Sequence, residues 1–466
     1  MTAASMLVLL ALTIPILVGS HRSALLALVA GTMFLGQGVS FHIGLNIYPM
    51  RFLVLVAFIR VFMRREMTFA GLNGLDRVFI GAYGFAVMVY LIRTAMGYGT
   101  SEAISQTSNL SKFGGFCDMF LGYFAFRGLL RSTDDLRFFL IRFPAMLLPY
   151  VGSLAVERVS GTNPLGMLGG PPNMWLDAEG RARCFGSFAH PSILGTFGAS
   201  FLLLYVPLFV ERATRMRATI AIGLCLAIVG FASSGSPVTF LALGLGVWAL
   251  WPLRRNVALL KAGLGVGLVI TALAMNSPIW YLPTRISGII GGSGWHRSYL
   301  MERGFGDIDK WWLAGMPLDL TVGWFPYLIM GAADMTNLFL QFGVDGGLLA
   351  LLLLVLALVI AFRRLGRALV AARQAPDDRS SERFLWALAA VLIAHVVNFF
   401  AITYFDQFNM IWMMQMAAIS AVTAEVLKRS LEREAVRAPS VGEPGLGTAG
   451  RHKDRRMARE IGNHRR

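Results

Sequence analysis

Long apolar runs recur along this chain up to about residue 427 and limit what it can fold into. A run of about 17 to 25 apolar residues has the length that a helix needs to cross a hydrocarbon core of roughly 30 Å. The 466-residue sequence is 56% hydrophobic and 15% charged, whereas soluble chains carry about 25% charged residues. The sequence therefore predicts an all-α, polytopic helical membrane protein.

The apolar runs predict about twelve to thirteen membrane-spanning helices within residues 1–430, which form the expected transmembrane domain. The helices are expected near residues 5–19, 23–39, 46–63, 75–93, 112–130, 136–155, 189–210, 217–233, 236–252, 257–275, 336–362, 384–402 and 407–427. Residues 431–466 contain Pro, Gly and many charges but no apolar period. This composition predicts a disordered, basic tail.

Lysine and arginine residues lie in alternate connectors between these runs, and their placement indicates an orientation. The basic connectors lie at 60–77, 127–137, 212–217, 254–255 and 363–383. The positive-inside rule places these connectors and the tail in the cytoplasm. The N-terminus and two longer loops, 156–188 and 276–335, are then expected outside. Orientation in a membrane accounts for the net charge of +16 without a nucleic-acid partner.

The loop at 276–335 is the strongest candidate for function, because a loop this long and polar inside a compact protein is usually functional. Trp295, His296 and Arg297 are adjacent in it, and Asp334 lies where the chain re-enters the membrane. Histidine and carboxylate side chains are candidates for general acid or base chemistry. We expect His296, Asp334 and also His190, at the start of the run at 189–210, to be candidate catalytic residues.

Arginines on the outer side depart from the charge bias and therefore need an explanation. A guanidinium group binds phosphate through two parallel hydrogen bonds and stays charged. Arg183 and Arg297 are the main candidates to bind a lipid pyrophosphate, with Arg181 and Arg51 as further candidates. Contact with lipid headgroups is the alternative for each. Trp295 is a candidate to stack on a sugar, although aromatic residues also line membrane interfaces.

Several classes of function lack their sequence signals. The chain has no P-loop, dinucleotide fingerprint, HExxH motif or nucleophile elbow. Its three cysteines have neither disulfide nor metal-ligand spacing. No internal duplication of the kind that many transporters contain is visible. Neither a cofactor nor a metal ion is expected. His395 and Asn398 lie inside a span, where polar residues usually mediate helix contacts.

Four segments, taken in order, resemble the bacterial O-antigen polymerase and ligase superfamily, which includes exopolysaccharide polymerases. The resemblance covers about Arg181 to Leu427. The segments are "RCFGSFAHPSILGT", "SSGSPVTFLALGLG", "WHRSYLMERGF" followed by "WWLAGMPL", and "DMTNLFLQFGVDGGLLALLLL". In this family Arg183 and Arg297 match the phosphate-binding arginines, and Asn337 matches the asparagine of the re-entry motif.

The resemblance implies a membrane glycosyltransferase of the C-type class, inverting and independent of metal. Its donor is a glycan on undecaprenyl pyrophosphate at the periplasmic face of the bacterial inner membrane, and other polysaccharide export proteins are candidate partners. The chain departs from the family at Pro237, Thr336 and Ser192, where arginine, histidine and asparagine are usual. Because the ligases rely on that histidine, the sequence favours a polysaccharide polymerase. An O-antigen ligase and a transporter without chemistry remain alternatives.

Overall fold

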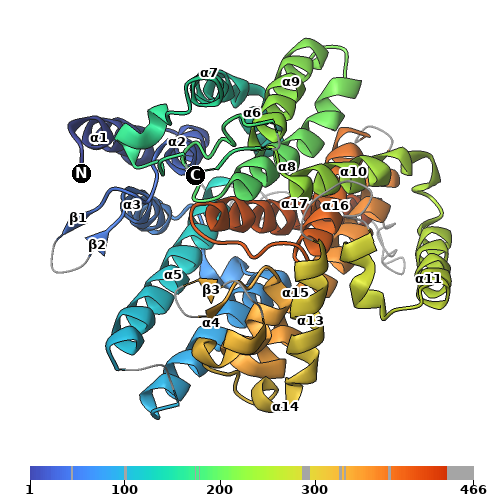
Figure 1. The fold of residues 1–466 in the computed structure, drawn as a ribbon. Coiled ribbons are helices and arrows are strands. Elements are labelled where there is room, and N and C mark those ends of the chain that lie inside the picture. The colour runs from blue at the N-terminus through green and yellow to red at the C-terminus, as the bar shows by residue number, and fades with distance from the viewer. Residues whose placement is uncertain are drawn as a thin grey trace, which may run out of the picture. The chain divides into compact units, whose positions relative to one another are not determined.

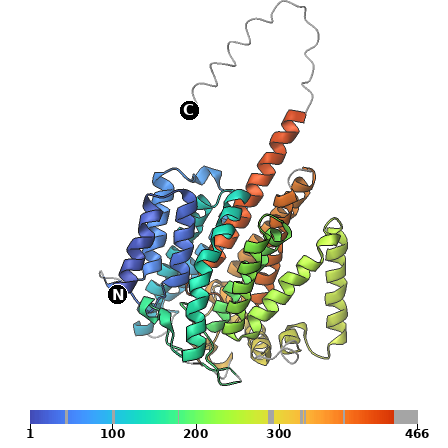
Figure 2. The same ribbon diagram turned by 90° about the horizontal axis from the view of Figure 1, so that it is seen from above.

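The computed structural model describes residues 1–42, 46–98, 102–173, 175–177, 179–285, 294–324, 328–329, 332–375 and 379–437. The chain divides into two units, Met1–Val426 and Leu427–Arg466. The first unit is a bundle of helices (Figures 1 and 2). The α-helices are α1 (Ala3–Leu17), α2 (His21–Phe34), α3 (Pro49–Met63), α4 (Gly74–Ala95), α5 (Glu102–Leu129), α6 (Thr133–Arg142), α7 (Pro144–Ser160), α8 (Pro191–Val210), α9 (Arg215–Ala232), α10 (Gly235–Ala249), α11 (Val257–Ala274), α13 (Gly294–Gly306), α14 (Ile308–Trp311), α15 (Leu338–Arg373), α16 (Arg379–Asn398) and α17 (Phe408–Arg437).

Shorter elements connect these helices. The 3-10 helices are η1 (Phe69–Gly71), η2 (Pro164–Leu168), η3 (Trp251–Leu253), η4 (Ile279–Tyr281) and η5 (Leu318–Trp324). Two antiparallel pairs of two-residue strands complete the fold, β1 (Phe41–His42) with β2 (Asn46–Ile47) and β3 (Leu328–Ile329) with β4 (Ala332–Ala333). The predicted fold class, an all-α, polytopic helical membrane protein, is therefore confirmed.

Each predicted span coincides with a helix, except that the span at 136–155 falls on both α6 and α7. Not every helix is long enough to cross a membrane. Among the described residues, seven helices are sufficiently long and apolar (α4, α8, α9, α11, α15, α16 and α17), or eight if α6 and α7, bent by 43°, form one span. The predicted number of about thirteen is too high by this measure. The reason is that α1, α2, α3 and α10 have only 14 or 15 residues and that α5, although 28 residues long, is not apolar enough.

The position of each helix follows from where its apolar residues lie. Helix α8 is apolar on all sides, almost all of its residues are buried, and it packs against α9, α10 and α16. Helix α15 packs against α4, and α3 against α5. Helix α11 is equally apolar but has no buried residue. An apolar helix without protein neighbours on its faces needs lipid around it.

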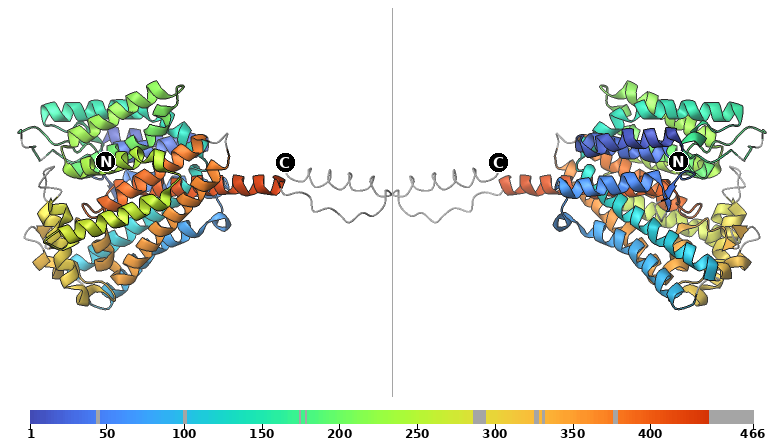
Figure 3. Two further views of the ribbon diagram at one scale, coloured as in Figure 1. Left: turned by 90° about the vertical axis from the view of Figure 1, so that its right-hand side faces the viewer. Right: turned by 90° about the vertical axis from the view of Figure 1, so that its left-hand side faces the viewer.

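The basic connectors gather at one end of the bundle, which we call the basic end. Ion pairs join residues within these connectors, between them, and with the start of α2. The pairs are Arg60–Glu66, Arg131–Glu66, Arg22–Asp135, Arg137–Glu211, Arg254–Glu382 and Arg373–Glu382. The described parts of the segments 161–190 and 276–335 lie at the opposite end, which we call the loop end, where α13 and α14 appear in gold in Figure 3.

The segment between α11 and α15 has a hydrophobic core of its own. Trp311 and Trp324 are each 1% exposed and pack with Leu300, Met316, Leu340 and Val344. The indole of Trp311 donates a hydrogen bond to the carbonyl of Gly304 at 2.7 Å, and that of Trp324 donates to Asp307 at 2.5 Å. These contacts hold the segment as a folded layer over the first turns of α15.

Helix α15 is broken at Gly347, whose φ of +77° is accessible to glycine but strained for other residues. Arg93 of α4 satisfies two carbonyl oxygens at the break, those of Ala314 and Val344, each at 3.0 Å. The residues before the break, 338–346, thus form a short helix that belongs to the loop end.

The first residues of the predicted C-terminal tail are helical, because α17 continues to Arg437. Residues 431–436 are exposed. The remainder of the predicted tail, residues 438–466, lies outside the described residues.

Candidate functional site

Arg183 is held at the loop end through its backbone, whose N–H donates to the carbonyl of Trp175 and whose carbonyl accepts from the amide of Asn173. Glu157 accepts hydrogen bonds from the backbone N–H of Phe185 at 2.8 Å and of Gly186 at 3.0 Å, and from the amide of Asn173 at 2.9 Å. This arrangement fixes the backbone that follows Arg183. The guanidinium of Arg183 lies 5.5 Å from the centre of the Trp175 ring. Its Nε is buried and has no hydrogen-bond partner among the described residues.

His190 caps the N-terminus of α8 and lies beside Arg183. Its Nδ1 accepts a hydrogen bond from the backbone N–H of Ser192 at 3.0 Å, so the proton of the neutral ring lies on Nε2. The ring meets Trp175 edge-on with centroids 4.7 Å apart. Burial and the positive charges of Arg183 and Arg297 lower the pKa of His190 to about 4. Arg183 and His190 both contact the Trp175 ring, and Arg297 acts on the imidazole through its charge.

Arg297 reaches the same place from α13. Its Nε donates a hydrogen bond to the carbonyl of Ala401 at 2.8 Å. Burial lowers the pKa of Arg297, and the charge of Asp334 opposes that shift. Within the part of the chain that the structure describes, neither Arg183 nor Arg297 forms an ion pair, so two half-buried positive charges face the same region without a carboxylate in contact. Such a pair attracts a bound anion.

Asp334 and His296 flank Arg297. Burial raises the pKa of Asp334, while the charge of Arg297 lowers it. Burial and Arg297 lower the pKa of His296 to about 4, and a hydrogen bond to the backbone of Asp334 opposes this. The structure therefore brings together five of the predicted residues, namely Arg183, His190, His296, Arg297 and Asp334. At neutral pH both histidines are uncharged.

The connector between α16 and α17, residues 399–407, joins these parts. Ala401 accepts the bond from Arg297, and the hydroxyl of Thr403 donates to the carbonyl of Met335. The carboxylate of Asp406 accepts from the backbone N–H of Ala189 at 3.0 Å. The connector thus contacts the arginine of α13, the re-entry segment and the loop that carries His190.

The other predicted site residues have local partners. Arg181 is exposed and pairs with Asp177 and Glu179. Trp295 is 52% exposed and stacks on Tyr299 with ring centroids 5.1 Å apart.

Arg51 and Asn337 are likewise engaged by neighbouring residues. Arg51 pairs with Asp118 of α5. Asn337 is 3% exposed and caps α15, accepting a hydrogen bond from the N–H of Leu340 at 3.0 Å. Each of these four residues has a partner other than Arg183 and Arg297. The substrate-binding roles of Arg181, Trp295, Arg51 and Asn337 remain predictions.

Pro237, Ser192 and Thr336, where the sequence departs from the family that it resembles, have different surroundings. Pro237 packs closely on Gly195 of α8, and the hydroxyls of Ser192 and Ser234 are 2.7 Å apart. Thr336 has a buried hydroxyl without a hydrogen-bond partner among the described residues. As predicted, His395 and Asn398 mediate helix contacts, since both bond to Tyr404 and His395 also bonds to Gln415.

Two residues of this site were not predicted, Trp175 and Asp406. Asp406 is the single charged residue in a connector of a few residues between two apolar runs, and that isolation is a usable signal. Trp175 carries no such signal, because its position depends on the fold of residues 161–190. No group of three or more His, Cys, Asp or Glu residues among those described could hold a metal ion. No protein-family model and no curated protein matches this chain.

Proposed function

We propose that this chain is a membrane glycosyltransferase that polymerises glycan repeat units carried on undecaprenyl pyrophosphate. In this proposal the basic end faces the cytoplasm, and the loop end faces the periplasm of a bacterial inner membrane, in accordance with the positive-inside rule. The product is an exopolysaccharide or O-antigen chain. We also propose that residues 276–335 form a large periplasmic loop and that the enzyme belongs to the C-type class of glycosyltransferases.

The observation that carries the proposal is the pair of arginines beside His190. Arg183 and Arg297 come from segments far apart in the sequence, are half-buried and lack carboxylate partners among the described residues. Burying a charge without a partner costs several kcal/mol, so such an arrangement is maintained where an anion completes it. A pyrophosphate has the charge and the oxygen geometry that two guanidinium groups bind best.

The chemistry follows from this placement. The hydroxyl oxygen of an acceptor sugar attacks the anomeric carbon of the donor glycan and forms the new glycosidic bond. The bond between that carbon and the pyrophosphate oxygen breaks, and its electron pair stays on the pyrophosphate. Arg183 and Arg297 stabilise the charge that grows there. Attack opposite the leaving group inverts the anomeric configuration, and a base takes the hydroxyl proton.

An O-antigen ligase would use the same donor but a different acceptor. Thr336 stands where the ligases have histidine, and its hydroxyl cannot replace an imidazole as a base near neutral pH. A transporter without chemistry would move the lipid-linked unit across the membrane. These alternatives predict different lipid-linked intermediates in a strain that lacks this chain.

The test compares those intermediates and the surface glycan in the deletion strain. Loss of a polymerase leaves single repeat units displayed on the periplasmic side, loss of a ligase leaves full-length chains on the carrier, and loss of a transporter traps units in the cytoplasm. Complementation with Arg183→Ala or Arg297→Ala should fail to restore long chains at normal protein level. Restored chain length in both variants would refute the proposal.

A further inference from the structure

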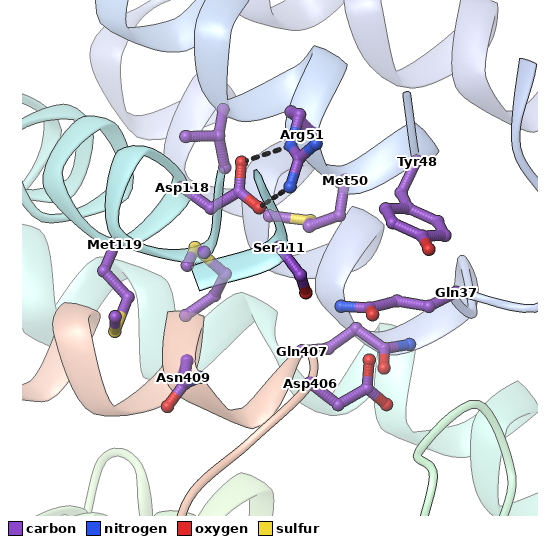
Figure 4. A pocket seen from close by; sticks show the side chains of 13 residues that line it. Gln37, Tyr48, Met50, Arg51, Ser111, Asp118, Met119, Asp406, Gln407 and Asn409 are labelled. Atoms are coloured by element: carbon purple, nitrogen blue, oxygen red, sulfur yellow. Dashed lines mark hydrogen bonds and ion pairs between the residues drawn. The ribbon is translucent and has the colours of Figure 1, made fainter. Parts of the chain in front are cut away.

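A cavity of about 230 Å³ lies at the loop end between α3, α5 and the start of α17. Figure 4 shows Gln37, Gln407 and Asp406 grouped on one side and the Arg51–Asp118 pair on the other. Gln37 and Ser111 are exposed at its mouth, while Met50, Gln407 and Met410 are at most 5% exposed on its floor. The cavity is smaller than the roughly 300–1,000 Å³ of a drug-sized pocket, which limits it to a ligand of about one ring.

The lining has the chemistry of a site for hydroxyl groups. Amides come from Gln37, Gln407 and Asn409, hydroxyls from Tyr48 and Ser111, and carboxylates from Asp118 and Asp406. Amides donate and accept hydrogen bonds, and carboxylates accept two or more, so together they match groups that both donate and accept. A sugar ring presents such groups on all sides.

The charges of the cavity disfavour an anion. Both terminal oxygens of Asp118 pair with Arg51, Oδ1 with Nε at 2.7 Å and Oδ2 with Nη2 at 2.8 Å. This pair is close to neutral as a unit, so the remaining charge on the wall is the carboxylate of Asp406. The cavity therefore differs from the region of Arg183 and Arg297, where two positive charges lack carboxylate partners.

Asp406 and Gln407 form the wall that the cavity shares with that region. Asp406 uses Oδ2 to accept from Ala189, the neighbour of His190, while its Oδ1 is buried and has no hydrogen-bond partner among the described residues. Gln407 uses its amide N–H groups on the carbonyls of Leu35 and Ser187, and its Oε1 likewise lacks a partner there. Two acceptor oxygens are thus buried on the wall of a polar cavity without donors among the described residues, and the hydroxyl groups of a ligand would supply such donors.

We propose that this cavity binds the terminal sugar of the acceptor glycan, and that Asp406 Oδ1 takes the proton of the attacking hydroxyl. The inference rests on the proposed function and adds to it the acceptor subsite and the base. Burial raises the pKa of Asp406 to about 7, close to the value that suits a general base at neutral pH. His190 and His296, with a pKa of about 4 each, are weaker bases.

The backbone of Asp406 supports a specific role for its side chain. Its φ is +57°, in the left-handed region that a non-glycine residue rarely adopts. This conformation orients the carboxylate between Ala189 and the cavity. During the transfer the acceptor O–H bond breaks, its proton moves to Asp406 Oδ1, and its oxygen bonds to the anomeric carbon as the pyrophosphate leaves with its electron pair.

Gly115 of α5 offers a way to fill the cavity without disturbing the helix. It lines the cavity, and a Cβ at this position would meet no atom within 4 Å. The variants Gly115→Ala, Gly115→Val and Gly115→Leu therefore add increasing volume to the space that the acceptor sugar needs. Gly81→Leu is the matched control, because Gly81 lies on α4 outside the cavity and is equally free of neighbours.

The experiment uses the full-length protein in lipid nanodiscs, with two probes. The first probe is undecaprenyl pyrophosphate without a glycan, and the second is the lipid-linked repeat unit extracted from the deletion strain. We expect the Gly115 series to bind the first probe as the wild type does, but to lengthen the second with a KM that rises at least tenfold at leucine. Asp406→Asn should also bind the first probe, with turnover reduced about 10²- to 10⁴-fold.

The outcomes separate this inference from the proposed function. If Gly115→Leu lengthens chains as well as Gly81→Leu does, the cavity is not the acceptor subsite. If Asp406→Asn retains the turnover of the wild type, Asp406 is not the base. A wild-type protein that neither binds undecaprenyl pyrophosphate nor lengthens the repeat unit would overturn the proposed function, and with it the inference.

Discussion

The two ends of the bundle use arginine in different ways. At the basic end, arginines pair with buried or half-buried carboxylates, and Arg60 also donates to backbone carbonyls of Ile16 and Gly19. At the loop end, Arg183 and Arg297 have backbone and aromatic contacts but no ion pair among the described residues. These arginines of the basic end are paired with protein carboxylates, whereas Arg183 and Arg297 have no carboxylate in contact among the described residues.

The difference shows which arginines serve the fold and which are available to bind a substrate. A buried arginine whose donors are all used by the protein contributes to folding, and its removal leaves its partners unsatisfied. Arg297 donates through its Nε to Ala401, which leaves its terminal nitrogens for another molecule, and the Nε of Arg183 has no partner among the described residues. Burial also lowers the pKa of Arg183 and Arg297, which indicates that their charges are not fully compensated by the protein.

The largest effect is expected from Arg60→Ala at the basic end. The side chain of Arg60 is 1% exposed and pairs with Glu66 at 3.0 Å. Its removal takes the buried donor from the Ile16 carbonyl and one of two cationic partners from Glu66, which keeps Arg131. This loss should cost about 3 kcal/mol of stability, the lower end of the range for a broken buried pair. Thermal unfolding in detergent measures this loss. Arg181→Ala, which removes an exposed pair, is the control and should unfold as the wild type does. Equal behaviour of the two variants would remove the structural role assigned to the basic end.

Arg297→Ala and Arg183→Ala should have the opposite profile, with lower activity and little change in stability. Loss of one group that stabilises the leaving pyrophosphate should reduce kcat about 10²- to 10³-fold. Turnover of the lipid-linked repeat unit measures the effect, and Arg181→Ala again serves as the control because Arg181 is close in sequence but already paired. A variant that unfolds as readily as Arg60→Ala while its folded fraction stays active would contradict the contrast between the two ends.

The sequence predicted the basic end better than the loop end, for a physical reason. Apolar period and charge placement are local properties, so they located the helices and the alternation of the connectors. The site depends on contacts between distant segments. Arg183 and Arg297 were found because guanidinium groups on the outer side are unusual, but Trp175, Asp406 and the cavity depend on how residues 161–190 and 399–407 pack. The capping roles of His190 and Asn337 also depend on where their helices begin.

The pH profile of turnover tests the loop end in a milder way. Because burial raises the pKa of Asp406 to about 7, and a base must be ionised, kcat should rise about tenfold per pH unit up to pH 7 and level off above it. The charged groups that line the cavity with Asp406 are Arg51 and Asp118, which form an ion pair. Neutral His190 and His296 should add no second limb between pH 5 and 8. If kcat shows a second pH-dependent change in this range, and this change is absent in His296→Gln, then His296 and not Asp406 is the base.

The smallest effect is expected from Asn337→Ala, which separates a structural role from a binding role at the re-entry of α15. The side chain of Asn337 accepts from the N–H of Leu340 and is 3% exposed, so its oxygen is already used to cap the helix. Loss of the cap should lower stability by about 1 kcal/mol, and Asn337→Asp, which keeps an acceptor oxygen, should restore it. If Asn337 only caps the helix, the KM for the lipid-linked repeat unit should be the same in the wild type and both variants. A KM that rises in Asn337→Asp without a loss of stability would show that its amide contacts the substrate.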